Sequence, residues 1–128
     1  MAGPGPKLVI QAVSDVTLVR FDEPSILEAA MVERLGLELY RLVDQMNRTK
    51  LILDFSKVQF LASGAVGVVI SLQKKVAAAK GKLVICALRR ELTKVFQILK
   101  IEKLFTFCAD EAAALKIFGF TAEPPAEA

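Results

Sequence analysis

The stretch from Leu51 to Lys75, LILDFSKVQFLASGAVGVVISLQKK, carries the pattern that decides the fold. An apolar run ends in Asp54, which is typical of a buried strand that reaches a charged edge of its sheet. A second apolar patch, Val58–Leu61, leads into Ala62-Ser63-Gly64-Ala65 and then into a predicted helix. Ser63 therefore lies at a predicted helix N-terminus, where free backbone N–H groups and the helix dipole favour negative charge. A serine in this position is either a helix N-cap or a phosphorylation site.

The residues before this stretch predict a hairpin and a long helix. Lys7–Val13 and Val16–Phe21 are apolar runs separated by Ser14-Asp15, a plausible hairpin turn. Ser25 and Glu28 have the spacing of a capping box. The apolar positions that follow recur at helical spacing up to a stop at Asn47: Leu27, Met31, Leu35, Leu39, Leu42 and Met46.

The order from Lys50 onward alternates strictly between strands and helices. Strands are predicted at 50–54, 83–87 and 104–108, and helices at about 63–79, 91–100 and 110–118, with Gly81 and Gly119 as helix stops. This order predicts one α/β domain over residues 7–119, with a mixed, mainly parallel sheet of about five strands and four helices. Residues 1–6 and 120–128 read as flexible ends. One shared core is expected from Leu27, Met31, Leu35, Leu39, Leu42, Val66, Val69, Val76, Leu92, Phe96 and Leu115.

In sheets of this kind, ligands and partners gather at the carboxyl ends of the parallel strands. Three segments are predicted to converge there: Asp22–Ser25, Val58–Ala65 and Leu88–Arg90. Ser63 lies in the middle segment. The sequence therefore indicates a functional surface around Ser63 before any family is considered.

Residues 51–54, 60–63 and Gly67 resemble the core of the STAS domain, the fold of bacterial anti-sigma factor antagonists. The family pattern is an apolar strand, Asp, a short turn, then Asp-Ser-Ser/Thr-Gly-Leu-Gly opening a helix, and Ser63 falls on its phosphoacceptor serine. Ala62, Gly64 and Ala65 replace the family's acid, second hydroxyl residue and first glycine. The resemblance continues through a glycine turn and strand at 80–85, apolar positions between 92 and 105 and a capped helix at 110–114, and it covers roughly residues 9–118.

The amino-acid composition limits the functions that the chain can be expected to have. The 128 residues are 54% hydrophobic and 24% charged, which is typical of a compact globular chain. No apolar run is long enough to span a bilayer and residues 1–6 lack a signal-peptide pattern, so the cytoplasm is the expected location.

The charge pattern does not favour nucleic-acid binding. The net charge is only +3 and the chain has no tryptophan. The lysines of the second half are interpreted as a solvated helix face or as a contact face for an acidic partner. Cys86 and Cys108 are expected to be buried thiols and not a disulfide.

Enzymatic functions fit the sequence poorly. The chain has no histidine, which is the commonest general base and metal ligand. No Cys, Asp and Glu residues have metal-site spacing, and the only glycine-rich piece lacks the phosphate-binding patterns. We therefore expect no enzyme activity, no cofactor and no metal.

The resemblance implies a protein-binding switch. An anti-sigma factor of the serine-kinase type would be sequestered by the dephosphorylated chain, phosphorylation at Ser63 would inactivate the chain, and a PP2C-like phosphatase would reset it. The expected partner surface comprises Asp22, Glu23, Ser25, Asp54, Ala62, Ser63, Gly64, Ala65, Val66, Arg89 and Arg90.

Simpler roles stay open for several of these residues. Asp54 is either a structural strand terminus or a contact residue, Asp22 and Glu23 are either a solvated loop or part of the contact, and Arg89 and Arg90 either steer an acidic partner or merely begin a helix. The alternative function is a constitutive STAS domain in a signalling or lipid-transport assembly without phosphorylation, which the changes at Ala62, Gly64 and Ala65 favour. Small-ligand or nucleotide binding in the cleft at the sheet end is a third hypothesis.

Overall fold

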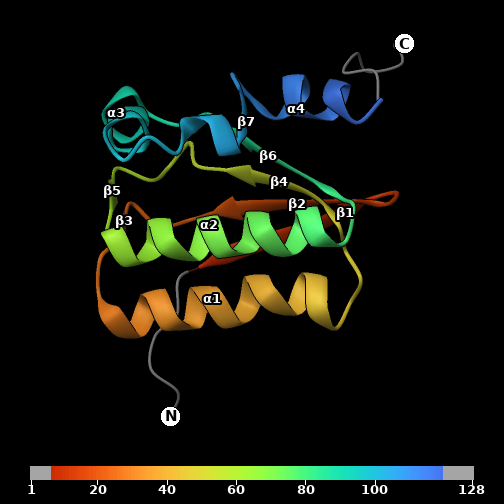
Figure 1. Cartoon of the computed structure of the whole chain (residues 1–128), viewed down its shortest axis with the longest axis horizontal. Helices are drawn as coiled ribbons and strands as arrows, with labels where there is room; N and C mark the ends of the chain where they lie inside the picture. The colour runs from red at the N-terminus through yellow and green to blue at the C-terminus, as the bar shows by residue number, and fades with distance from the viewer. Residues whose placement is uncertain (1–6, 120–128) are drawn as a thin grey trace.

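The computed structural model describes residues 7–119, and the predicted flexible ends, 1–6 and 120–128, lie outside the described residues. Its central sheet has five strands in the order β1-β2-β4-β6-β7 (Figure 1). The strands are β1 Leu8–Val13, β2 Val16–Phe21, β4 Lys50–Asp54, β6 Lys82–Cys86 and β7 Thr106–Cys108. β1 and β2 form the predicted antiparallel hairpin, and every other neighbouring pair is parallel. The predicted α/β class, the mixed sheet and the four helices are therefore confirmed.

The helices cover the two faces of the sheet unequally. α1 (Ala29–Asp44) and α2 (Ser63–Ala78) lie side by side over one face (Figure 1). α3 (Arg90–Ile98) contributes Leu92 and Phe96 to the same core. α4 (Glu111–Ile117) packs on the opposite face, where Ala114 is buried against Leu18 and Ile52. A short 3-10 helix, Glu102–Leu104, precedes β7.

The expected single core is therefore wrong in part. Leu35, Leu39, Leu42, Val66, Val69, Val76, Leu92 and Phe96 are buried in the main core, with Met31 packed against it. Leu115 lies in a second cluster below the sheet, because alternate residues of each strand point to opposite faces. Leu27 and Met46 are 53% and 56% exposed, since α1 begins only at Ala29 and ends at Asp44.

The structure corrects two predictions of helix ends, the capping box at Ser25 and the helix stop at Gly81. Ser25 and Ile26 form β3, which pairs in parallel with β5 (Phe60–Leu61) in a small second sheet, so the predicted capping box does not exist. α1 instead begins after Glu28 without a side-chain cap. After α2, the residue with positive φ is Lys80 and not Gly81, and Gly81 instead allows a close approach to the Thr49 backbone. Gly119, with φ of 94°, follows α4 as predicted.

Cys86 and Cys108 are free thiols on neighbouring strands. Cys86 is fully buried, and this burial raises its pKa. The prediction of buried thiols and not a disulfide is confirmed for Cys86, whereas Cys108 is half-buried.

Candidate functional site

Ser63 is the first residue of α2 and is exposed to solvent. The residue at the N-cap position is Ala62, whose backbone is extended (φ −68°, ψ 154°) and whose methyl side chain cannot accept a hydrogen bond. The N-cap interpretation of Ser63 is therefore wrong. Within residues 7–119, α2 starts without a side-chain cap, so the N–H groups of Ser63 and Gly64 are left for solvent or for an anion, whereas the Ala65 N–H donates to the Ala62 carbonyl at 2.9 Å.

Backbone hydrogen bonds to the β3 segment fix the position of the Ser63 loop. The N–H groups of Gln59 and Phe60 both donate to the Pro24 carbonyl, at 2.7 and 3.0 Å. The Ala62 N–H donates to the Ile26 carbonyl at 2.9 Å. Ile26 itself is fully buried, which anchors the segment to the core. The small β3–β5 sheet therefore presents Ser63 on a rigid support rather than on a free loop.

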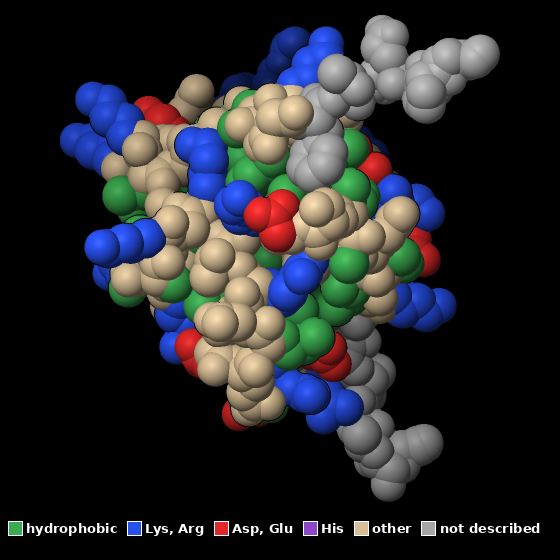
Figure 2. Space-filling view, turned by 90° about the vertical axis from the view of Figure 1, so that its right-hand side faces the viewer, with side chains coloured by type: hydrophobic (Ala, Val, Ile, Leu, Met, Phe, Trp, Pro, Cys, Tyr) green, Lys and Arg blue, Asp and Glu red, His purple; other side chains and the backbone are tan. Residues whose placement is uncertain are grey.

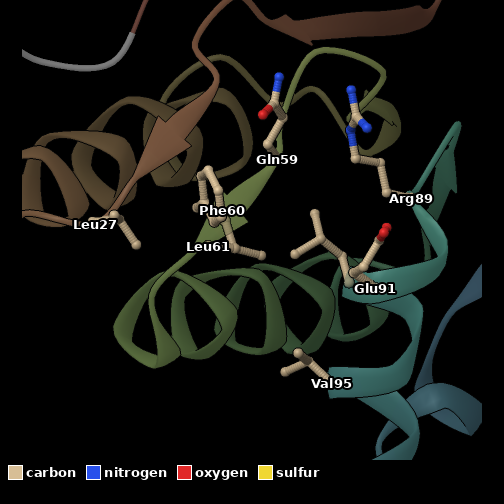
Figure 3. Close-up of a pocket in the computed structure, with 8 residues that line it drawn as sticks. Leu27, Gln59, Phe60, Leu61, Arg89, Glu91 and Val95 are labelled. Carbon is tan, nitrogen blue, oxygen red and sulfur yellow. The ribbon is translucent and has the colours of Figure 1, made fainter.

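Two grooves meet at this support. The first, of about 410 Å³, runs between β5 and α3, where Leu61 and Val95 point into the space and Gln59 and Arg89 stand at one rim (Figure 3). The second, of about 510 Å³, lies between the start of α1 and the start of α2 and is lined by Val32, Ala62 and Gly64. Leu27 lines both grooves. Ser63 follows Leu61 of the first groove and precedes Gly64 of the second.

Exposed apolar side chains border the Ser63 loop. Leu27 is 53% and Phe60 is 56% exposed, and both line the first groove. Figure 3 shows both on the β3–β5 side of the first groove. The expected partner surface omits these two residues and Gln59, although Gln59 and Phe60 belong to the segment 58–65 that is predicted to reach this edge. Leu27 fits the helical spacing, which predicts a core position. The surface around Ser63 can therefore bind a partner that brings apolar side chains of its own.

The predicted site residues divide between this surface and other parts of the molecule. Arg89 lines the first groove at the start of α3 together with Glu91, and Arg90 is exposed next to it. Ser25 is paired with Phe60 in the small sheet. Ala65 and Val66 are buried in the main core, which corrects their assignment to the surface.

Asp22 and Glu23 line neither of the two grooves. The Asp22 carboxylate forms an ion pair with Lys57 at 2.8 Å, and this hydrogen bond lowers the pKa of Asp22. Glu23 accepts a hydrogen bond from the Lys7 backbone N–H at 3.3 Å. Asp22 lines a separate, smaller groove with Val9 and Arg20. The structure therefore does not bring these two acids together with Ser63.

Asp54 belongs to a polar cluster on the α4 face of the sheet. It is 7% exposed and accepts a hydrogen bond from the Ser56 backbone N–H at 2.8 Å. Burial raises the pKa of Asp54, and the nearby Glu111 raises it further. Glu111 in turn accepts two hydrogen bonds from Arg20, at 2.6 and 2.8 Å, which lower the pKa of Glu111. The Arg20–Glu111 ion pair therefore joins β2 to α4, and the buried Asp54 carboxylate lies beside it.

The described residues show no metal-binding cluster and no membrane-spanning helix, and their basic side chains are dispersed. Residues 7–119 bring no three His, Cys, Asp or Glu side chains together in a way that suits a metal ion. None of their helices combines the length and hydropathy needed to cross a bilayer. On the end of the molecule drawn in Figure 2, Lys and Arg side chains are scattered over the surface, at its centre and its edges, and are separated by apolar, acidic and other polar surface. That distribution is typical of solvated charges.

The fold and the site together define a small α/β domain that presents a serine at a helix start between two grooves. The sequence profile of the STAS domain matches residues 7–114. The chain belongs to the STAS domain family.

Relatives with names or solved structures agree with this assignment. A Bordetella bronchiseptica protein whose provisional name is anti-sigma factor antagonist BtrV is 28% identical over 93 residues, which cover 73% of this chain and 79% of BtrV. The anti-sigma factor antagonist SpoIIAA in its unphosphorylated form superposes with a TM-score of 0.71 at 20% identity, over 89% of this chain and all of SpoIIAA.

Two further structures share the fold. The phosphorylated form of Bacillus SpoIIAA gives a TM-score of 0.69 at 20% identity, over 87% of this chain and 99% of SpoIIAA. Murine Slc26a9, an anion transporter, gives 0.68 at 14% identity, over 84% of this chain and 18% of the transporter. At these identities the structural likeness shows the fold alone.

Proposed function

We propose that this chain is an anti-sigma factor antagonist that acts in the cytoplasm and binds an anti-sigma factor through the surface around Ser63. The observation that carries the proposal is the exposed Ser63 at an uncapped helix start, between two grooves bordered by exposed Leu27 and Phe60. The name of BtrV supports the partner class. The chain binds and does not catalyse.

Phosphorylation of Ser63 is the proposed switch. A phosphate would add a charge of about −1.5 to −2 and three acceptor oxygens. The fold would tolerate it, because the free N–H groups and the dipole of α2 favour an anion at that position. An apolar partner surface seated over Leu27 and Phe60 would not tolerate it, because a buried unpaired charge is costly. The partner kinase would supply the phosphoryl group, and a PP2C-like phosphatase would remove it.

Three serine variants test the switch. Ser63→Asp should leave thermal unfolding nearly unchanged and weaken binding of the anti-sigma factor in a pull-down, whereas Ser63→Ala should bind but resist phosphorylation by the partner kinase and ATP. Ser71→Asp is the matched control, because Ser71 is exposed on the same helix two turns further on. Equal binding by wild type, Ser63→Asp and Ser71→Asp would refute the switch.

Apolar variants test the surface separately from the switch. Phe60→Ser should weaken partner binding without lowering stability, since Phe60 is already 56% exposed. Unchanged binding by Phe60→Ser would show that the partner docks elsewhere.

A second function is favoured by the residues around Ser63. Ala62, Gly64 and Ala65 depart from the pattern of switchable family members, and a transporter also carries this fold. A constitutive STAS domain in a signalling or lipid-transport assembly would use the same surface without phosphorylation. Mass spectrometry of the protein from its own cells decides between the two, because only the switch requires a phosphate on Ser63.

A further inference from the structure

In the part of the chain that the structure describes, β1 forms the outer edge of the central sheet. Within residues 7–119, β1 is the terminal strand and pairs only with β2. Its sequence, Leu-Val-Ile-Gln-Ala-Val, contains no charge and no proline. Proteins usually protect an edge strand with lysine, proline, a bulge or a covering element, because its free backbone groups can pair with another strand. Val9 and Ile10 are 45% and 44% exposed on this edge.

The hairpin register determines which backbone groups are free. The Asp22 N–H donates to the Lys7 carbonyl at 2.8 Å, which makes these two residues a hydrogen-bonded pair. Hydrogen-bonded pairs alternate along an antiparallel ladder, so the register assigns Val9, Gln11 and Val13 to bonds with β2. The three residues between them, Leu8, Ile10 and Ala12, therefore direct their N–H and C=O groups toward the open edge.

These three residues are self-complementary under a two-fold axis. In an antiparallel pair of β1 strands centred on Ile10, Ile10 faces Ile10 of the second copy and Leu8 faces Ala12. All the outward N–H and C=O groups of the three residues are then satisfied. The two five-stranded sheets become one continuous sheet. An axis perpendicular to the sheet leaves both α1 helices on the same face, running antiparallel to each other.

The surface of α1 next to the axis is also self-complementary in charge. Ile10 shares one groove with Glu38, Arg41 and Met46. A neighbouring groove on α1 is lined by Leu37 with the same Glu38 and Arg41. Within residues 7–119, neither Glu38 nor Arg41 has an ion-pair partner. If the two antiparallel α1 helices cross at a point between Glu38 and Arg41, which both line the groove of Ile10, Glu38 of each copy lies opposite Arg41 of the other.

Apolar surface is available beside these charges. Met46, which follows α1 and shares the groove of Ile10, is 56% exposed, and Leu37 is 57% exposed in the neighbouring groove on the other flank of Glu38 and Arg41. An interface of this kind would combine a continuous backbone ladder, apolar contacts and two symmetric ion pairs, which together favour an isologous dimer.

We propose that β1 and the adjoining face of α1 bind a second copy of this chain, forming a two-fold dimer with a continuous sheet. The dimer does not depend on the function proposed above. Its surface uses none of the residues that line the two grooves at Ser63.

A charge exchange tests the proposal on the full chain by sedimentation equilibrium. Wild type should sediment as a dimer that dissociates on dilution. Glu38→Arg and Arg41→Glu should each raise the dissociation constant by about tenfold or more, because like charges then face each other across the axis. An equimolar mixture of the two variants should form a heterodimer, since opposite charges then meet at both symmetric contacts. The double variant should dimerise again for the same reason.

Two further variants test whether the dimer forms through β1 and whether the charge effects are specific to Glu38 and Arg41. Ile10→Lys should abolish the dimer by placing two ammonium groups at the axis, and circular dichroism should show the fold retained because Ile10 is already exposed. Glu33→Arg is the control, since this substitution makes the same charge change on the same helix. Glu33 lines the groove of Ala62 and Gly64 and not the proposed dimer surface. A monomeric wild type, a dimer indifferent to Ile10→Lys, or a mixture that stays monomeric would overturn the proposal. Capture of another protein's strand by a monomeric wild type would overturn it as well.

Discussion

The close approach of two backbone segments at Gly81 offers a sharp test of the fold. A Cβ atom at Gly81 would lie 2.0 Å from the Thr49 carbonyl oxygen and 2.8 Å from the Thr49 carbonyl carbon. Both atoms belong to the backbone, so rotation of a side chain cannot relieve the clash. The same carbonyl accepts a hydrogen bond from the Lys82 N–H at 2.8 Å, at the start of the β4–β6 ladder. Gly81→Ala must therefore push the two strands apart at their first rung.

The expected cost combines two effects. Overpacking of a close contact typically costs about 1–3 kcal/mol. Loss of the Lys82–Thr49 hydrogen bond adds about 1 kcal/mol. We therefore expect Gly81→Ala to lower the free energy of unfolding by about 2–4 kcal/mol.

Gly67→Ala is the matched control, because it makes the same substitution with the opposite expected sign. Gly67 lies inside α2, and a Cβ there would meet nothing within 4 Å. Alanine should stabilise this helix position by about 0.5–1 kcal/mol. Urea unfolding followed by far-ultraviolet circular dichroism measures both effects, and suits a chain with no tryptophan and one tyrosine. A Gly81→Ala midpoint equal to wild type, or a Gly67→Ala midpoint below it, would refute the reasoning.

Two other variants probe the core and the polar cluster. Leu39→Ala, at a fully buried position of α1, should cost about 2–5 kcal/mol in urea unfolding, and a loss under about 1 kcal/mol would contradict the described packing of α1. Asp54→Asn should raise stability at neutral pH: the folded-state pKa of Asp54 lies above its unfolded value, so stability falls as the pH rises through the folded pKa. Below the unfolded value of 3.8 this gain should vanish, as parallel melting curves at acid and neutral pH would show.

The parts of the fold that the sequence predicts well are those set by periodicity. Leu35, Leu39 and Leu42 repeat at helical spacing because one face of α1 is buried, and all three are in the core. The strand from Lys50 to Asp54 is equally clear, since both of its faces are covered by helices. Ser63 is correctly placed at the start of α2 because small residues separate the apolar patch from the helix.

Tertiary contacts decide the features that the sequence does not reveal. Ser25 and Glu28 have helix-start spacing, yet Ser25 lies in β3 because the 24–26 segment satisfies the backbone of Gln59, Phe60 and Ala62. Leu27 continues the apolar period of α1 but precedes the helix, so it is exposed and lines the grooves. The direction of Asp54 toward α4 follows from strand alternation once the pairing is known. It cannot be read from an apolar run that ends in an acid.

The position of Ser63 also determines how a phosphate there could act. The helix that carries it is fixed in the core by Val66, Val69, Leu72 and Val76, all at most 1% exposed. The loop before it is held by three backbone hydrogen bonds to the Pro24 and Ile26 carbonyls. Because the helix and the loop are held in this way, a phosphate on Ser63 is not expected to order or unfold the segment that carries it. We therefore expect the phosphate to act directly on the docked surface, and the free chain should show the same backbone in both states.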